Sequence, residues 1–149
     1  MGESCCSTKT TDCGKEAGPF FGRFLISLIF ILAGTGKFFD FGGAVEALRQ
    51  MGIHGAGVYA VLGLILELVG GILVLLGWYT RLGVYLLMIF LLPTTLIFHG
   101  FWNYSGPEMA LQLSIFLKNL TIYGGLLYIL SYGPGKWSLD ACRICKPKE

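Results

Sequence analysis

The sequence is poor in charge. Asp, Glu, Lys and Arg together make up only 13% of its 149 residues, whereas hydrophobic residues make up 54%. A soluble domain carries about 25% charged residues, so this chain has roughly half the charge that a water-facing surface needs. The 11 basic and 9 acidic residues leave a net charge of +2 and form no basic stripe. These shortages exclude a soluble globule, a disordered chain and a nucleic-acid-binding protein.

What the sequence does contain is four long apolar segments. A membrane-spanning helix needs about 20 mostly apolar residues, and the segments of that kind are residues 20–39, 57–78, 82–101 and 108–132. Between the first two, residues 40–53 place Val45 and Leu48 on one helical face and are predicted to lie on the membrane surface. The sequence therefore predicts an all-α membrane protein, a four-transmembrane-helix bundle in the lipid bilayer with a short amphipathic surface helix between its first two spans.

The chain divides into two tails and a membrane domain. We expect residues 1–19 to form a cysteine-containing tail, residues 20–135 the four-helix membrane domain, and residues 136–149 a tail with a Cys-x-x-Cys motif. Four spans place both tails on one side, and Lys and Arg decide which side that is. The opposite side carries Lys37 and Arg49, and the side of the tails carries eight basic residues: Lys9, Lys15, Arg23, Arg81, Lys136, Arg143, Lys146 and Lys148. This bias predicts a multi-pass protein of the cytoplasmic (inner) membrane with both termini in the cytoplasm.

Ionisable residues inside the spans are costly and therefore informative. Glu67 interrupts the second span and Lys118 the fourth, each about ten residues from the outer end. At 1.5 Å per residue both lie roughly 15 Å deep, so the two opposite charges are predicted to form one buried pair. Arg23 and Lys37 lie near the ends of the first span, where long basic side chains can snorkel to the headgroups.

The polar residues of the spans are predicted to line one pocket in the outer half of the bundle. Its members are Lys37, Glu67, Thr95, His99, Lys118 and Asn119. Glu67, His99 and Lys118 are the catalytic candidates because they can hold or move protons, and the other three are candidates for ligand binding. Two alternatives stay open: a structural Glu–Lys lock that fixes helix register, and a hydrogen-bonded interfacial histidine in place of a proton carrier at position 99.

The tails contain five cysteines: Cys5, Cys6, Cys13, Cys142 and Cys145. Because all lie on one side of the membrane, four of them could surround a zinc ion or an iron–sulfur cluster. The spacing of Cys142 and Cys145 is typical of a redox or metal pair. Unligated thiols, kept reduced in a cytoplasmic compartment, and a thiol or persulfide role remain alternatives to a metal site.

An ordered set of short motifs resembles the DoxX family of small four-span membrane proteins. The matching segments are Gly34-Thr-Gly-Lys37, Glu67-Leu-Val-Gly-Gly71, Gly77-Trp-Tyr-Thr-Arg81, His99, Lys118-Asn119-Leu, Gly124-Gly125 and Gly133-Pro-Gly-Lys-Trp-Ser138-Leu-Asp140. The family is named after a membrane subunit of an archaeal thiosulfate:quinone oxidoreductase. The resemblance therefore implies a subunit linked to redox or sulfur metabolism and, if the chain is enzymatic, the membrane part of a thiol- or thiosulfate-type quinone oxidoreductase. The cysteine-bearing tails depart from the family pattern.

Three functions remain open from the sequence. The first is binding of a quinone or another small ligand in the outer pocket, with electrons from a soluble redox partner or from the chain's own cysteines. The second is a small-solute transporter or binding module, for which four spans favour a homodimer. The third is a membrane assembly factor that holds a soluble enzyme through the tails.

Overall fold

The computed structural model describes residues 13–144, and every regular element in that range is a helix. The elements are α1 (Cys13–Phe39), α2 (Phe41–Gln50), α3 (Ala56–Leu76), α4 (Thr80–Phe98), the 3-10 helix η1 (Phe101–Asn103), α5 (Pro107–Tyr132) and α6 (Leu139–Ile144). Four of them, α1, α3, α4 and α5, are long and apolar enough to cross a membrane. The predicted all-α bundle with a short helix between its first two spans is confirmed. The first helix begins at Cys13, earlier than the expected span, because a helix need not end where its apolar stretch ends.

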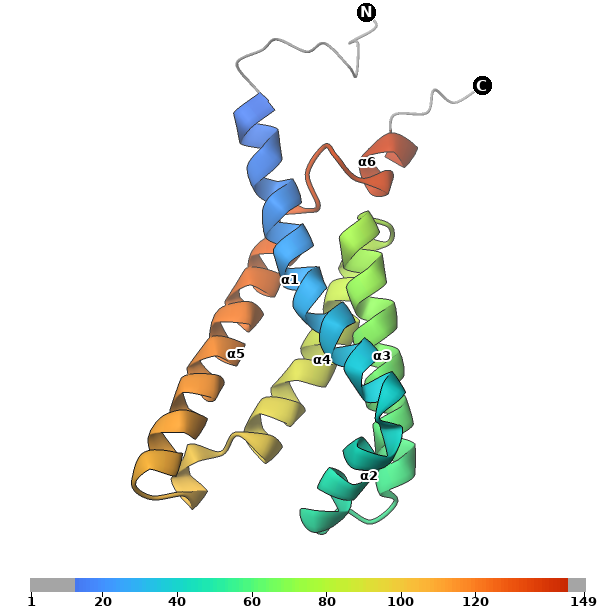
Figure 1. Ribbon diagram of the computed structural model, residues 1–149. Helices are drawn as coiled ribbons and strands as arrows, with labels where there is room; N and C mark the ends of the chain where they lie inside the picture. Colours follow the sequence, from blue (N-terminus) through green and yellow to red (C-terminus); the bar gives the residue numbers. More distant parts are fainter. Residues whose placement is uncertain (1–12, 145–149) are drawn as a thin grey trace, which may run out of the picture.

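The four long helices run alternately between two ends of the bundle (Figure 1). One end, called the tail end here, carries the α3–α4 turn and α6; the other, the far end, carries α2 and η1. α3 packs against both α1 and α4, and α5 packs mainly against α4. α1 and α5 meet toward the tail end, where a Cβ on Gly125 would lie 2.7 Å from Cδ1 of Ile26. Figure 1 shows the same two helices diverging toward the far end, so the bundle is closed at the tail end and splayed at the far end.

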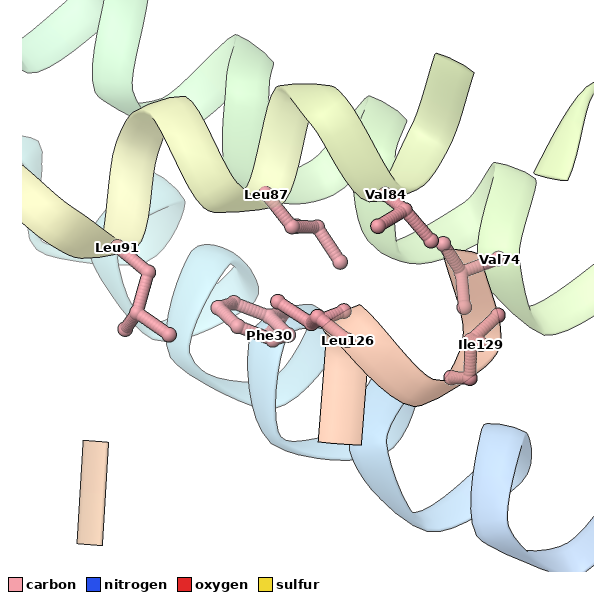
Figure 2. Packing of buried hydrophobic residues seen from close by; sticks show 7 residues of the cluster. All are labelled: Phe30, Val74, Val84, Leu87, Leu91, Leu126 and Ile129. Atoms are coloured by element: carbon pink, nitrogen blue, oxygen red, sulfur yellow. The ribbon is translucent and has the colours of Figure 1, made fainter. Parts of the chain in front are cut away.

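A small apolar core joins all four long helices (Figure 2). It consists of Phe30 from α1, Val74 from α3, Val84, Leu87 and Leu91 from α4, and Leu126 and Ile129 from α5. Most other large apolar side chains on these helices are exposed. In a water-soluble protein such exposure of apolar side chains would be unfavourable, but it suits helices whose outer faces contact lipid.

α3 and α4 approach each other closely at two glycines. A Cβ on Gly83 would lie 2.8 Å from Cβ of Leu73 and 3.1 Å from the Gly70 carbonyl oxygen. A Cβ on Gly70 would in turn lie 3.1 Å from the Gly83 carbonyl oxygen. Only glycine at both positions lets the two backbones come this near, which is the usual role of small residues between membrane helices.

α2 lies beside the far-end part of α3. Asp40 caps its first turn, because a side-chain oxygen accepts a hydrogen bond from the Gly43 amide at 3.1 Å. Val45 and Leu48 are half-buried, whereas Glu46 and Arg49 are exposed and form a loose surface pair at 3.8 Å. The predicted amphipathic helix is therefore present, with its apolar face inward.

Arg23 is the largest fully buried side chain of the described residues. Its guanidinium donates to the carbonyl oxygen of Pro134 and, at 2.7 Å, to that of Trp137. The expectation that Arg23 snorkels to the headgroups is therefore wrong. The loop after α5 folds over the side chain and supplies acceptors inside the protein, which makes an exit to the membrane surface unnecessary.

Asp140 ties α6 to the α3–α4 turn. Its carboxylate accepts hydrogen bonds from the backbone amides of Tyr79 at 2.9 Å and Thr80 at 2.8 Å, and from the Thr80 hydroxyl at 2.7 Å. α4 has no capping side chain of its own at its first residue, so Asp140 acts as a cap supplied from a distant part of the chain. Part of the segment expected as a tail is thus bonded to the membrane domain.

Replacing Asp140 by alanine is expected to lower the free energy of unfolding by about 1–2 kcal/mol, because loss of a helix cap leaves amide groups without a partner. Thermal unfolding in mild detergent measures the change. Glu46→Ala is the control, because an exposed substitution on α2 should stay within about 0.5 kcal/mol of the unaltered protein. Equal effects of the two substitutions would contradict the capping role.

Candidate functional site

An ion pair between α1 and α3 forms the centre of the candidate site. Lys37 Nζ lies 2.6 Å from Glu67 Oε2; the Glu67 side chain is buried, whereas the Lys37 side chain is 38% exposed. The same ammonium lies 4.8 Å from the centroid of the Phe90 ring on α4, within the range of a cation–π contact. Three helices thus contribute one residue each to a charged centre within the membrane-spanning region.

Two glycines make room for this centre. Gly34 lies one helical turn before Lys37, and a Cβ there would lie 2.6 Å from Cδ2 of Leu68 on α3. Gly63 lies one turn before Glu67, and a Cβ there would lie 3.2 Å from the Phe90 ring. Residues three or four apart share a helical face. Gly34 and Lys37 therefore both face α3, whereas on α3 Gly63 faces Phe90 of α4 and Glu67 faces Lys37 of α1. The Gly34–Lys37 and Gly63–Glu67 spacings therefore have a steric reason.

The predicted pair of Glu67 with Lys118 is wrong, because Glu67 pairs with Lys37. Lys118 is exposed on α5, and no carboxylate of residues 13–144 forms an ion pair with it. Equal depth along two helices does not make them neighbours. α3 packs between α1 and α4, and α5 diverges toward the far end, so the nearest cation to Glu67 comes from α1.

Lys37 also departs from its expected orientation. The snorkelling geometry predicted for it is wrong, because its ammonium bonds to Glu67 inside the bundle. A lysine that finds a buried carboxylate within reach gains more from pairing than from extending to the headgroups. The ion pair brings Lys37 and Glu67 together, and the outer pocket predicted from all the polar residues of the spans stays a prediction.

The remaining predicted residues lie apart from the ion pair. His99 Nδ1 lies 2.9 Å from Oε1 of Gln112, which links the end of α4 to α5. Thr95 is buried, but its hydroxyl donates to the Leu91 carbonyl oxygen of its own helix at 2.7 Å. Asn119 is half-buried on α5. No hydrogen bond within the described part of the chain joins these three residues to Lys37 or Glu67.

Sequence reasoning missed Phe90 and Gln112. Gln112 carried a usable signal, since it is a polar residue within an apolar span, as are the residues that were selected. Phe90 carried none, because an aromatic residue in a membrane helix is ordinary until its ring is seen beside an ammonium group.

The cysteine predictions fall mostly outside the described residues. Cys5, Cys6 and Cys145 lie outside residues 13–144, and for Cys13 in α1 and Cys142 in α6 the structure describes the backbone alone. Among the side chains that the structure describes between residues 13 and 144, no three of His, Cys, Asp or Glu come together as a metal-binding group. A metal centre on the tails therefore stays a prediction.

Comparisons of the chain with a family model and with individual proteins agree with each other. The DoxX family model matches residues 18–100. The chain is 34% identical to the inner membrane protein YqjF of Escherichia coli over 126 residues, which cover 85% of this chain and 92% of that protein. It is 32% identical to the inner membrane protein YphA of the same organism over 118 residues, 79% of this chain and 84% of that protein.

A mycobacterial membrane protein is also similar over most of the chain. The uncharacterized membrane protein Rv3486 of Mycobacterium tuberculosis is 32% identical over 133 residues, 79% of this chain and 76% of that protein. No solved structure is significantly similar to the chain.

Proposed function

Because the chain belongs to the DoxX family, we propose that this membrane protein binds a quinone beside the Lys37–Glu67 pair and serves as the membrane subunit of a redox system. The observation that carries the proposal is the unequal burial of the two side chains in this ion pair. The Glu67 side chain is 4% exposed, whereas the Lys37 side chain remains 38% exposed. A lock with a purely structural role would be expected to enclose both partners.

The donors of Lys37 suit a carbonyl ligand. An ammonium group has three N–H donors, and one of them points at Glu67. The others remain for a carbonyl oxygen that approaches from the membrane, and the Phe90 ring offers an apolar surface beside them. In this proposal Lys37 binds the ligand, Glu67 orients Lys37, and the Glu67 carboxylate can hold or release a proton. A bound quinone would supply the chemistry of accepting two electrons and two protons.

The electrons have to come from elsewhere in this scheme. A soluble redox partner or the tail cysteines would provide them, with zinc or an iron–sulfur cluster as a further option for the cysteines. We place the protein in the inner membrane, as the names of its bacterial relatives suggest. We also propose that both tails lie in the cytoplasm, on the side that carries eight of the ten basic residues outside the span centres.

Quinone binding is tested with full-length protein in nanodiscs and decylubiquinone as the probe. At a probe concentration of 100 times Kd, binding should raise the free energy of unfolding by about 2.7 kcal/mol. Lys37→Met should weaken the probe's Kd at least about tenfold, because it removes the donor. The Kd is read from tryptophan quenching well below the melting temperature, so lower stability of the variant does not disturb it.

Arg49→Met is the matched control, because Arg49 is an exposed basic residue on α2 at the same end of the bundle. It should leave the Kd unchanged. If the unaltered protein does not bind the probe, or if Lys37→Met binds it equally well, the quinone proposal fails and the structural lock remains.

A further inference from the structure

α5 is the least buried of the four spans. In its most apolar stretch 11% of the residues are buried, against 22–28% in the other three. Its two buried residues, Leu126 and Ile129, both lie in the half nearer the tail end. Apolar residues on the remaining surface are ordinary for a helix in lipid, but Lys118 is not.

Lys118 lies deep in the membrane by its position in the helix. α5 has 26 residues and is therefore about 39 Å long, against about 30 Å for the hydrocarbon core. Lys118 follows Pro107 by eleven residues, which places its backbone about 16 Å from the start of the helix. If the helix is centred, that point is about 12 Å inside the hydrocarbon boundary, farther than a lysine side chain can snorkel.

The orientation of Lys118 follows from its neighbour on the same face. Gly125 packs against Ile26 of α1, and residues seven apart share a face of an α-helix. Lys118 therefore faces the side on which α1 and α5 diverge toward the far end (Figure 1). The nearby hydroxyls of Ser114 and Thr121 donate to carbonyl oxygens of their own helix, at 2.9 Å each, and bring no negative charge.

The described residues of a second copy of the chain do not supply the missing charge. Of the carboxylates that the structure describes, Glu67 is buried and paired with Lys37. Asp40, Glu46 and Glu108 lie at the far end, the first two at or in α2 and the third in the first turn of α5, and Asp140 lies at the tail end. Packing of α5 on α5 about a two-fold axis along the membrane normal would bring Lys118 against its own copy, which adds repulsion.

We propose that the exposed face of α5 binds a transmembrane helix of a different protein through a carboxylate that pairs with Lys118 near the middle of the membrane. An unpaired lysine at this depth costs roughly 2.5–3.5 kcal/mol on insertion scales, and a carboxylate at the same depth removes much of that cost. The proposal depends on the charge and exposure of Lys118 and is independent of quinone binding.

The association is measured by energy transfer in zwitterionic phosphatidylcholine vesicles. The full-length protein carries a donor dye, and the probe is a synthetic leucine-rich transmembrane peptide with an acceptor dye and one central glutamate. A second peptide has glutamine at that position. The unaltered protein should bind the glutamate peptide at least about tenfold more tightly than the glutamine peptide. Lys118→Met should bind the two peptides equally.

A variant in which the lysine is moved to another side of α5 tests whether the preference for glutamate depends on the position of Lys118 or only on its positive charge. In the double variant Lys118→Leu/Leu120→Lys the lysine moves to a position that is also exposed but lies on the other side of the helix, and the preference for glutamate should be lost. Preservation of the preference in that variant, or its absence in the unaltered protein, would overturn the proposal. Loss of the preference for glutamate when 20% phosphatidylglycerol is added would also overturn the proposal, because the negative charge beside Lys118 would then come from lipid.

Discussion

Replacing Lys37 by methionine is expected to lower the free energy of unfolding of the membrane domain by about 3–5 kcal/mol, because removal of one partner strands a buried charge. The stranded group is the carboxylate of Glu67, whose side chain is 4% exposed. Glu67→Gln should cost less, because Lys37 keeps a side chain that is 38% exposed and can turn toward lipid headgroups or water. Unfolding in mixed detergent micelles measures both losses.

The double variant Lys37→Met/Glu67→Gln tests whether the two residues interact. It should recover part of the summed loss, because neither charge is then left alone, and the interaction energy follows from the double-mutant cycle. Lys118→Met is the comparison that separates the observed partner from the one predicted by depth. It should show no coupling to Glu67→Gln. Simple addition of the Lys37 and Glu67 losses, or coupling of Glu67 to Lys118, would contradict the observed arrangement.

Replacing Gly83 by alanine is expected to destabilise the bundle by about 1–3 kcal/mol, the usual cost of forcing extra volume into a packed interface. The added methyl group would lie 2.8 Å from Cβ of Leu73 and 3.1 Å from the Gly70 carbonyl oxygen. Neither atom belongs to the flexible end of a side chain, so the helices themselves must separate. Thermal unfolding in the same detergent gives the size of the loss.

Gly124→Ala is the matched control for this effect. Gly124 also lies inside a spanning helix, but a Cβ there would have no neighbour within 4 Å. Alanine at that site should be neutral or stabilise the protein by roughly 0.5–1 kcal/mol, because glycine is the poorer helix former. If the two alanine variants behave alike, the close approach of α3 and α4 at Gly83 is not required for stability.

The number and approximate limits of the membrane helices could be predicted from the sequence. Long apolar runs are set by the thickness of the hydrocarbon core, and every backbone polar group in that core has to be satisfied within its own helix. Local composition therefore decides where a span lies, whichever helices surround it. The surface helix followed for the same reason, since the alternation around Val45 and Leu48 is a local pattern.

The importance of Glu67 was also visible in the sequence, because a carboxylate inside a span is costly wherever it lies. Its partner was not. Depth along a helix can be counted from the sequence, and it places Lys118 level with Glu67, but which helices touch is decided by packing between distant segments. The approach of Gly34 to Leu68 and the divergence of α5 bring Lys37 to Glu67 and leave Lys118 exposed.

Arg23 and Asp140, at the tail end, show the same difference between what the sequence indicates and what only the tertiary structure decides. The sequence alone indicated that Arg23 lies near a membrane boundary, where headgroups could satisfy it, and that Asp140 lies in the segment expected as a tail. Only the tertiary structure places the loop after α5 over Arg23 and brings Asp140 to the first turn of α4. Spans are determined locally by hydrophobic burial, whereas partners of buried charges depend on contacts between residues 30 to 114 positions apart, which no local pattern of the sequence encodes.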